Sequence, residues 1–231
     1  FNTINNPQRP TRGRSRSVSF QIAGGPLGGD TSFLKPVVNF ITYRRIRGRH
    51  YLGFRAQAGL VREWQGGSEV LSSSIQGVPR FERFWLGGDT LGPRVFETRS
   101  IAPLRYVEIN EAGEIITVLG DPRFIAAQDL VTSGGIPVLI EVGGDRVYLF
   151  QTEYVVPLGQ QAELSLFVDV GDALFDDQSF GFDTARVSSG VEVRFYLPIF
   201  PVPLRLIYGV PLRELEGDRT QSFTFSIGRS F

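Results

Sequence analysis

The chain has 231 residues, a formal net charge of zero, 42% hydrophobic residues and no cysteine. A zero net charge gives no indication of a nucleic-acid partner, and the lack of cysteine excludes disulfides and thiolate metal ligands. No run of about 18 apolar residues occurs, which excludes a transmembrane helix but leaves a soluble β fold and a membrane β-barrel open. Because the chain opens at Phe1 without a charged leader or apolar signal core, we expect any export signal to have been removed.

Apolar and polar residues alternate with a period of two along most of the chain, whereas helical periodicity is almost absent. Successive side chains of a strand point to opposite sides, so each such segment has one apolar and one polar face. The alternation places Glu153 and Asp169 on the polar faces of neighbouring strands. In chain order, the predicted strands are residues 15–23, 34–45, 50–62, 80–86, 144–157, 161–171, 188–197, 203–210 and 219–231.

Three features of these segments favour a membrane β-barrel over a soluble β-sandwich. Several segments have the roughly 9–11 residues that a tilted strand needs to cross a bilayer. Aromatic residues gather near segment ends, and short connections alternate with long ones, as in barrels with short periplasmic turns and long outer loops. We therefore predict an all-β, transmembrane antiparallel up-and-down β-barrel. The pattern gives about nine or ten strands. Nine would fit a complete barrel poorly, because single-chain bacterial barrels usually have an even number, so either a tenth strand is present or the chain is part of a larger barrel.

The long stretch 87–143 contains too many apolar residues for plain disorder, and connections of this length are usually functional. We predict a folded loop that caps or enters the barrel. Residues 106–119 are interpreted as a small extracellular hairpin within it, and residues 136–142 as an extension of the fifth strand. The shorter stretch 63–79 is predicted to be a polar loop.

Residues 79–89, Pro-Arg-Phe-Glu-Arg-Phe-Trp-Leu-Gly-Gly-Asp, followed by Arg94-Val95-Phe96 and residues 99–103, resemble the BamA-type outer-membrane protein insertase superfamily. In that family this strand end leads into the sixth extracellular loop, which folds back into the lumen and carries a Val-Arg-Gly-Phe motif. The resemblance implies that Arg94 and Phe96 match the motif's Arg and Phe. Pro93 and Val95 replace its first residue and its Gly, so a residue with unusual backbone freedom is missing at the tip.

The resemblance extends in family order along nearly the whole chain. It implies a sixteen-stranded barrel preceded by POTRA domains, of which this chain covers the part from about the seventh or eighth strand onward, without the POTRA domains. Residues 1–231 are thus expected to form one barrel segment that includes the loop 87–143. The matching segments are residues 23–36, residues 153–158 and 167–171, residues 203–212, residues 217–219, and a C-terminal strand signal made by Phe223, Phe225, Ile227 and Phe231.

A carboxylate pair inside a lumen needs a cation, because like charges placed close together raise each other's pKa. Arg94 is the candidate cation for Glu153 and Asp169, since its planar guanidinium can bridge two carboxylates. The family pattern implies this contact, which we call the latch. The alternative is that Arg55, Arg194 or Arg205 neutralises the carboxylates while Arg94 lies in solvent.

The resemblance implies a core component of outer-membrane protein assembly in Gram-negative bacteria. Its expected partners are outer-membrane lipids, unfolded outer-membrane protein clients and accessory assembly lipoproteins, with no nucleic acid. A polypeptide-secreting transporter of the same superfamily, a passive porin-like channel and a soluble all-β binding protein are the alternatives. His50, the only histidine, has no serine or orienting group nearby for hydrolase chemistry. We therefore predict no enzymatic activity, no cofactor and no metal site.

Overall fold

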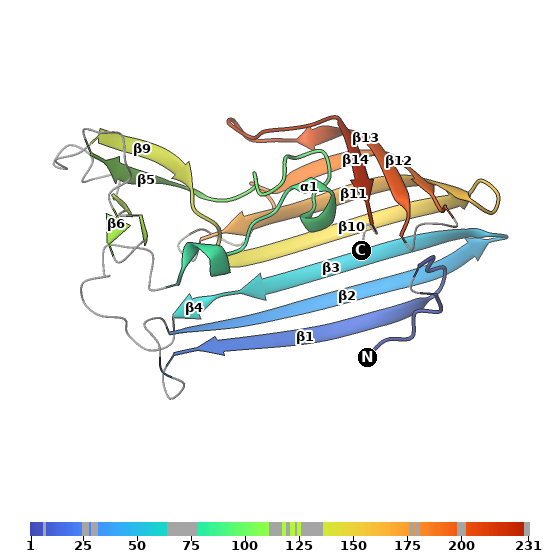
Figure 1. Ribbon diagram of the computed structural model, residues 1–231, viewed down its shortest axis with the longest axis horizontal. Helices are drawn as coiled ribbons and strands as arrows, with labels where there is room; N and C mark the ends of the chain where they lie inside the picture. The colour runs from blue at the N-terminus through green and yellow to red at the C-terminus, as the bar shows by residue number, and fades with distance from the viewer. Residues whose placement is uncertain are drawn as a thin grey trace.

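One antiparallel sheet forms most of the protein (Figure 1). The computed structural model describes residues 1–6, 8–24, 28, 32–63, 78–110, 117–118, 121–122, 124–125, 136–175, 178, 181–197 and 202–228. The sheet curves in Figure 1, with β1 and β14 at its two edges, and the all-β antiparallel prediction is confirmed. Its strands, in spatial order, are β1 (Gly13–Ala23), β2 (Phe33–Arg47), β3 (His50–Leu60), β10 (Arg146–Pro157), β11 (Ala162–Leu174), β12 (Arg186–Phe195), β13 (Leu204–Arg213) and β14 (Phe223–Ile227), and the short β4 (Arg62–Glu63) pairs with β2.

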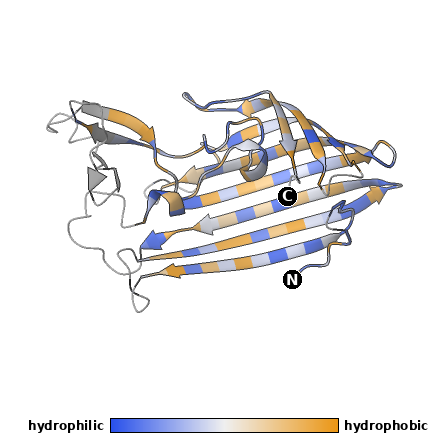
Figure 2. Ribbon diagram, viewed as in Figure 1, coloured by the Kyte–Doolittle hydropathy of each residue, from blue (hydrophilic) through white to orange (hydrophobic). Residues whose placement is uncertain are grey.

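The period-two pattern gives this sheet two chemically different faces, visible as stripes along the strands in Figure 2. On the outer face the register aligns apolar side chains, for example Val18 with Val38 and Leu166 with Val191. These side chains are exposed, Val18 to 73%, as expected for a surface that lipid rather than water covers. The inner face is polar and largely buried. Its buried polar and charged strand residues are Gln151, Glu153, Glu163, Ser165, Asp169, Ser188, Glu192, Arg194 and Arg205.

The predicted strand at residues 80–86 is wrong, because the main sheet passes directly from β3 to β10. Residues Arg80–Glu82 form the 3₁₀ turn η3, and Phe84 and Leu86 make only isolated bridges to Gly144 and Ile101. Phe84 and Leu86 are instead buried in an apolar cluster between this segment and the inner face of the sheet, so packing overrides the alternating pattern. The cluster consists of Phe33, Val61, Val78, Phe84, Leu86, Phe96, Ile101, Val147 and Leu149.

A second, small sheet lies beyond the end of the main sheet at which β3 ends and β10 begins (Figure 1). It contains β8 (Phe124–Ile125), β5 (Leu104–Ile109) and β9 (Ile136–Glu141), while β6 (Thr117–Val118) pairs with β7 (Asp121–Pro122). The predicted hairpin at 106–119 is wrong, since β5 pairs with β8 and β9. Residues 136–142 do not extend β10 either, because Gly143, at φ 81°, turns the chain between the two strands. Most of the predicted polar loop 63–79 lies outside the described residues.

The only helical turn besides η3 in the described part of the chain is α1 (Gly88–Leu91), which lies over the inner face of the sheet in Figure 1. Within the residues that the structure describes, no helix has the length and apolar character needed to cross a membrane.

Candidate functional site

Residues 87–101 form a compact turn that brings Arg94 to the inner face of the sheet. Gly87 and Gly88 adopt φ of 104° and 86°, which favours glycine, and a Cβ on Gly87 would collide with the Glu97 carbonyl. The amide of Gly87 donates to the Gly92 carbonyl at 2.7 Å, and the amide of Gly88 donates to the Phe96 carbonyl at 2.8 Å. The glycine pair therefore closes the turn tightly enough to hold Arg94 over the sheet.

Arg94 contacts carboxylates from three adjacent strands. Its Nε and Nη2 donate to the two oxygens of Asp169 on β11 at 2.8 and 2.7 Å, and its backbone amide donates to Asp169 Oδ2 at 2.9 Å. Its Nη1 donates to Glu153 on β10 at 2.6 Å and to Glu192 on β12 at 2.9 Å. The guanidinium also stacks 3.9 Å from the ring centroid of Phe167. Arg94 is thus held by a forked ion pair, two further ion pairs and an aromatic face.

The contact around Arg94 is shielded from solvent. The side chains of Arg94, Glu153, Asp169 and Glu192 are fully buried. Burial lowers the pKa of Arg94, a loop residue, but the attraction of Asp169, followed by that of Glu153, outweighs it and raises this pKa. The guanidinium therefore stays charged inside the protein, and each carboxylate has a cation beside it.

Two further arginines extend this contact into a network. Arg194 pairs with Glu153 at 2.5 Å and with Glu192 at 2.6 Å. Arg205 grips Glu192 through Nε and Nη2 at 2.8 and 3.0 Å and reaches Asp89 of α1 at 3.0 Å. We call Arg94, Arg194, Arg205, Glu153, Asp169, Glu192 and Asp89 the inner-face network. Its members come from the loop and from β10 to β13.

The structure brings together the predicted residues Arg94, Glu153 and Asp169, and it also brings in two of the three rival cations, Arg194 and Arg205. The third, Arg55, donates to Gln57, to Gln151 and to the Thr90 carbonyl. Arg94 is buried rather than solvated. Sequence reasoning did not select Glu192 as a site residue, although the alternation of 191–197 put it on the polar face. The functional role of the contact as a latch stays a prediction.

Val95 and Phe96, next to Arg94, pack on different parts of the protein. Val95 adopts φ 82°, a conformation that β-branched residues rarely take, and it is buried against Phe167 and Ile207. Phe96 is buried in the apolar cluster of Phe84 and Leu86 described above. At the position where the family motif has Gly, the chain thus keeps the glycine-like backbone and adds an apolar contact.

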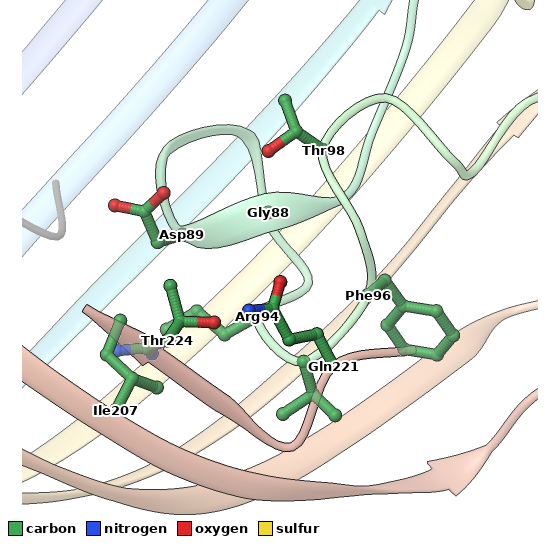
Figure 3. Close-up of a pocket in the computed structure, with 9 residues that line it drawn as sticks. Gly88, Asp89, Arg94, Phe96, Thr98, Ile207, Gln221 and Thr224 are labelled. Atoms are coloured by element: carbon green, nitrogen blue, oxygen red, sulfur yellow. The ribbon is translucent and has the colours of Figure 1, made fainter. Parts of the chain in front are cut away.

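A small pocket lies beside Arg94, Val95 and Phe96 at the tip of the loop (Figure 3). Its volume is about 30 Å³, roughly room for one water molecule. It is lined by Gly88, Asp89, Arg94, Val95, Phe96, Thr98, Ile207, Gln221 and Thr224. In the part of the chain that the structure describes, no group of three or more His, Asp or Glu residues is placed to hold a metal ion.

The predicted C-terminal strand signal lies on β14. Phe223, Phe225 and Ile227 alternate on its outer face and are each more than half exposed. Phe231 lies outside the described residues. None of these side chains belongs to the inner-face network, and their role as a signal stays a prediction.

Comparison with known proteins shows which family the chain resembles. Residues 1–231 match the family described as the Omp85 superfamily domain. The outer membrane protein assembly factor BamA of Nitratidesulfovibrio vulgaris is 30% identical over 235 residues, which cover 99% of this chain and 24% of that protein. The crystal structure of BamA from Haemophilus ducreyi lacking POTRA domains 1-3 matches with a TM-score of 0.71 at 19% identity, over 97% of this chain and 40% of that one.

The chain therefore spans about a quarter of the length of its BamA relative, and the structural likeness, at its low identity, concerns the fold. These matches confirm the predicted resemblance and the predicted location in the outer membrane of Gram-negative bacteria. The chain belongs to the Omp85 superfamily.

Proposed function

We propose that this chain is the C-terminal part of a barrel that folds and inserts β-barrel clients into the outer membrane. The observation that carries the proposal is Arg94, which a long loop delivers to carboxylates on β10, β11 and β12. An arginine buried among three strands fixes the loop against the inner face of the sheet, as a loop inserted into a lumen requires. The proposal includes closure into a sixteen-stranded barrel by strands that precede β1.

The proposed mechanism uses the edge of β14. Within the described residues, the paired register of β14 with β13 covers Phe223–Ile227, whereas β10 and β11 pair along Arg146–Pro157. A short terminal strand leaves a weak seam, where the strand of a client can add by backbone hydrogen bonding. The proposal includes local thinning of the bilayer beside this strand. The first strand of the seam lies upstream of β1, so insertion is expected of the longer protein.

Outer-membrane lipids, unfolded outer-membrane proteins and assembly lipoproteins are the proposed partners. The inner-face network is an ion-pair cluster with no activated nucleophile, which supports a role without catalysis.

The test is the charge reversal Arg94→Glu in the full-length protein, expressed in place of the native copy. We expect a lower amount of folded barrel, measured by heat-modifiable gel migration, and lower levels of client barrels in the outer membrane. Arg219→Glu is the matched control, because Arg219 pairs with Glu97 and Glu141 on the exposed loop surface. Normal levels of folded barrel and of clients in the Arg94 variant would contradict the proposal.

Two other functions correspond to distinct outcomes of further measurements. A polypeptide-secreting transporter would release its substrate outside the cell in a translocation assay and leave client levels unchanged when depleted. A passive porin would show steady single-channel conductance in planar bilayers. The loop that Arg94 fixes against the inner face of the sheet supports an occluded lumen over an open one.

A further inference from the structure

Three arginines lie on the outer face of the sheet, next to its apolar side chains, at the end where the tight turn joins β2 to β3. Val18, Arg16 and Arg14 follow one another with a period of two along β1. Their partners on β2 are Val38, Phe40 and Thr42, after which Arg44 takes the next position on the same face. Because side chains two apart share a face, Arg14, Arg16 and Arg44 lie directly below the apolar outer surface. We call these three residues the outer arginines.

The outer arginines are exposed and lack nearby counter-charges. In the described part of the chain none of the three forms an ion pair, and Arg16 instead lies 5.6 Å from the ring centroid of Phe40. The strand carboxylates at this end, Glu163 and Glu192, are buried on the inner face. Glu163 is already bound by Arg9, and Glu192 by the inner-face network. The positive charge on the outer surface therefore requires an external anion or water.

A hollow lies between two of these arginines. It has a volume of about 450 Å³ and is lined by Gly13, Arg14, Thr42, Tyr43 and Arg44. Gly13 contributes no side chain, so the backbone at the start of β1 forms part of the wall. The Thr42 hydroxyl donates only a long hydrogen bond, 3.4 Å, to the Gly13 carbonyl. Two arginines and a threonine therefore border a space large enough for a lipid headgroup.

We propose that the outer arginines bind the phosphate of an anionic phospholipid in the periplasmic leaflet, with its acyl chains along Val18 and Phe20. Short strand turns of outer-membrane barrels face the periplasm. Guanidinium groups bind phosphate through paired hydrogen bonds, and exposed apolar side chains directly above them match the acyl region. This inference rests on the proposed membrane-spanning barrel but is independent of insertion activity.

The experiment compares the full-length protein with the variant Arg14→Gln/Arg16→Gln/Arg44→Gln, both reconstituted in phosphatidylcholine vesicles. Spin-labelled phosphatidylglycerol and phosphatidylcholine report the relative association of each lipid with the protein. One arginine near an anionic surface corresponds to about a fivefold preference, so we expect at least about fivefold selectivity for phosphatidylglycerol in the parent. The triple variant is expected to show a ratio near one. Arg45→Gln/Arg49→Gln is the control, because it removes positive charge at the same end but away from the hollow: Arg45 lies opposite Tyr51 on the inner face, and Arg49 lies in the β2–β3 turn, where it donates to the Gly159 carbonyl.

Selectivity that persists in the triple variant, or falls equally in the control, overturns the proposal. Displacement of the lipid by 10 mM inorganic phosphate overturns it as well, since the site would then be a site for the free anion. Heat-modifiable migration verifies folding, and the single variant Arg44→Gln replaces the triple variant if that variant does not fold. Lipid selectivity is measured without a client, so failure of the insertion proposal leaves this result readable.

Discussion

Removal of Arg94 should destabilise the protein far more than removal of an exposed arginine that also pairs with more than one carboxylate. Arg94 makes three ion pairs, all with fully buried carboxylates. In the variant Arg94→Ala, Arg194 and Arg205 still pair with Glu153 and Glu192, but Asp169 loses the guanidinium that holds both of its oxygens. Loss of one partner of a buried charge cluster costs about 3–5 kcal/mol, so we expect a decrease of this size in the free energy of unfolding.

The assay is a urea titration of the protein refolded in detergent, followed by tryptophan fluorescence and heat-modifiable migration. Arg219→Ala is the control, because Arg219 pairs with Glu97 and Glu141 but its side chain is 51% exposed. The hydrogen bonds that Arg219 donates to Glu141 and Glu97 raise the pKa of Arg219. Solvent nevertheless screens these pairs, and exposed ion pairs contribute only about 0–1 kcal/mol.

A second variant separates charge imbalance from lost packing. Adding Asp169→Asn to Arg94→Ala removes the carboxylate that Arg94 holds through both oxygens and through its backbone amide. We expect the double variant to regain part of the lost stability, because its buried charges are again balanced. If Arg94→Ala and Arg219→Ala lose similar stability, or if Asp169→Asn deepens the loss, the inner-face network is not the stabilising unit described here.

Three other substitutions test the loop and the turn end. A glycine variant is usually less stable than the alanine variant at the same position. At Val95 we expect Val95→Gly to be at least as stable as Val95→Ala in the same urea titration, because φ 82° favours glycine. Phe96→Ala should cost about 3–5 kcal/mol of unfolding free energy, as for other large buried aromatics. Glu163→Gln should lower the urea midpoint by an amount equivalent to about 1.5–3 kcal/mol, because it removes the charge that Arg9, Tyr51 and Tyr196 contact.

Alternation predicted the strands well wherever one face meets lipid and the other meets the polar interior. Residues 50–62 and 144–157 correspond closely to β3, His50–Leu60, and β10, Arg146–Pro157. The same pattern misled at residues 80–86, where Phe84 and Leu86 pack under the loop instead of into the sheet. Local periodicity shows which side chains are apolar, but it does not show whether lipid, the sheet or another segment of the chain packs against them.

The site was partly predictable for a related reason. Glu153 and Asp169 lie on consecutive paired strands, so their shared face follows from the pattern within each strand. Glu192 and Arg205 join the network through the pairing of β12 with β11 and β13. A shift of one residue in that register would turn a side chain to the opposite face, and the register itself, with its irregularity between Val187 and Ser188, is not visible in the sequence.

The loop tip connects the inner-face network with the terminal strand. The Gln221 amide donates to the Val95 carbonyl at 2.6 Å, and the Glu97 amide donates to the Arg219 carbonyl at 3.0 Å. Val95 and Glu97, which follow Arg94 in the loop, thus form backbone hydrogen bonds with residues 219–221, which lead into β14. Each of these two neutral hydrogen bonds contributes about 0.5–1.5 kcal/mol to stability. Separating Arg94 from its buried carboxylates costs about 3–5 kcal/mol. A displacement of β14 by an incoming strand should therefore break the pairing with residues 219–221 first, while Arg94 stays in place and the loop remains attached to the sheet.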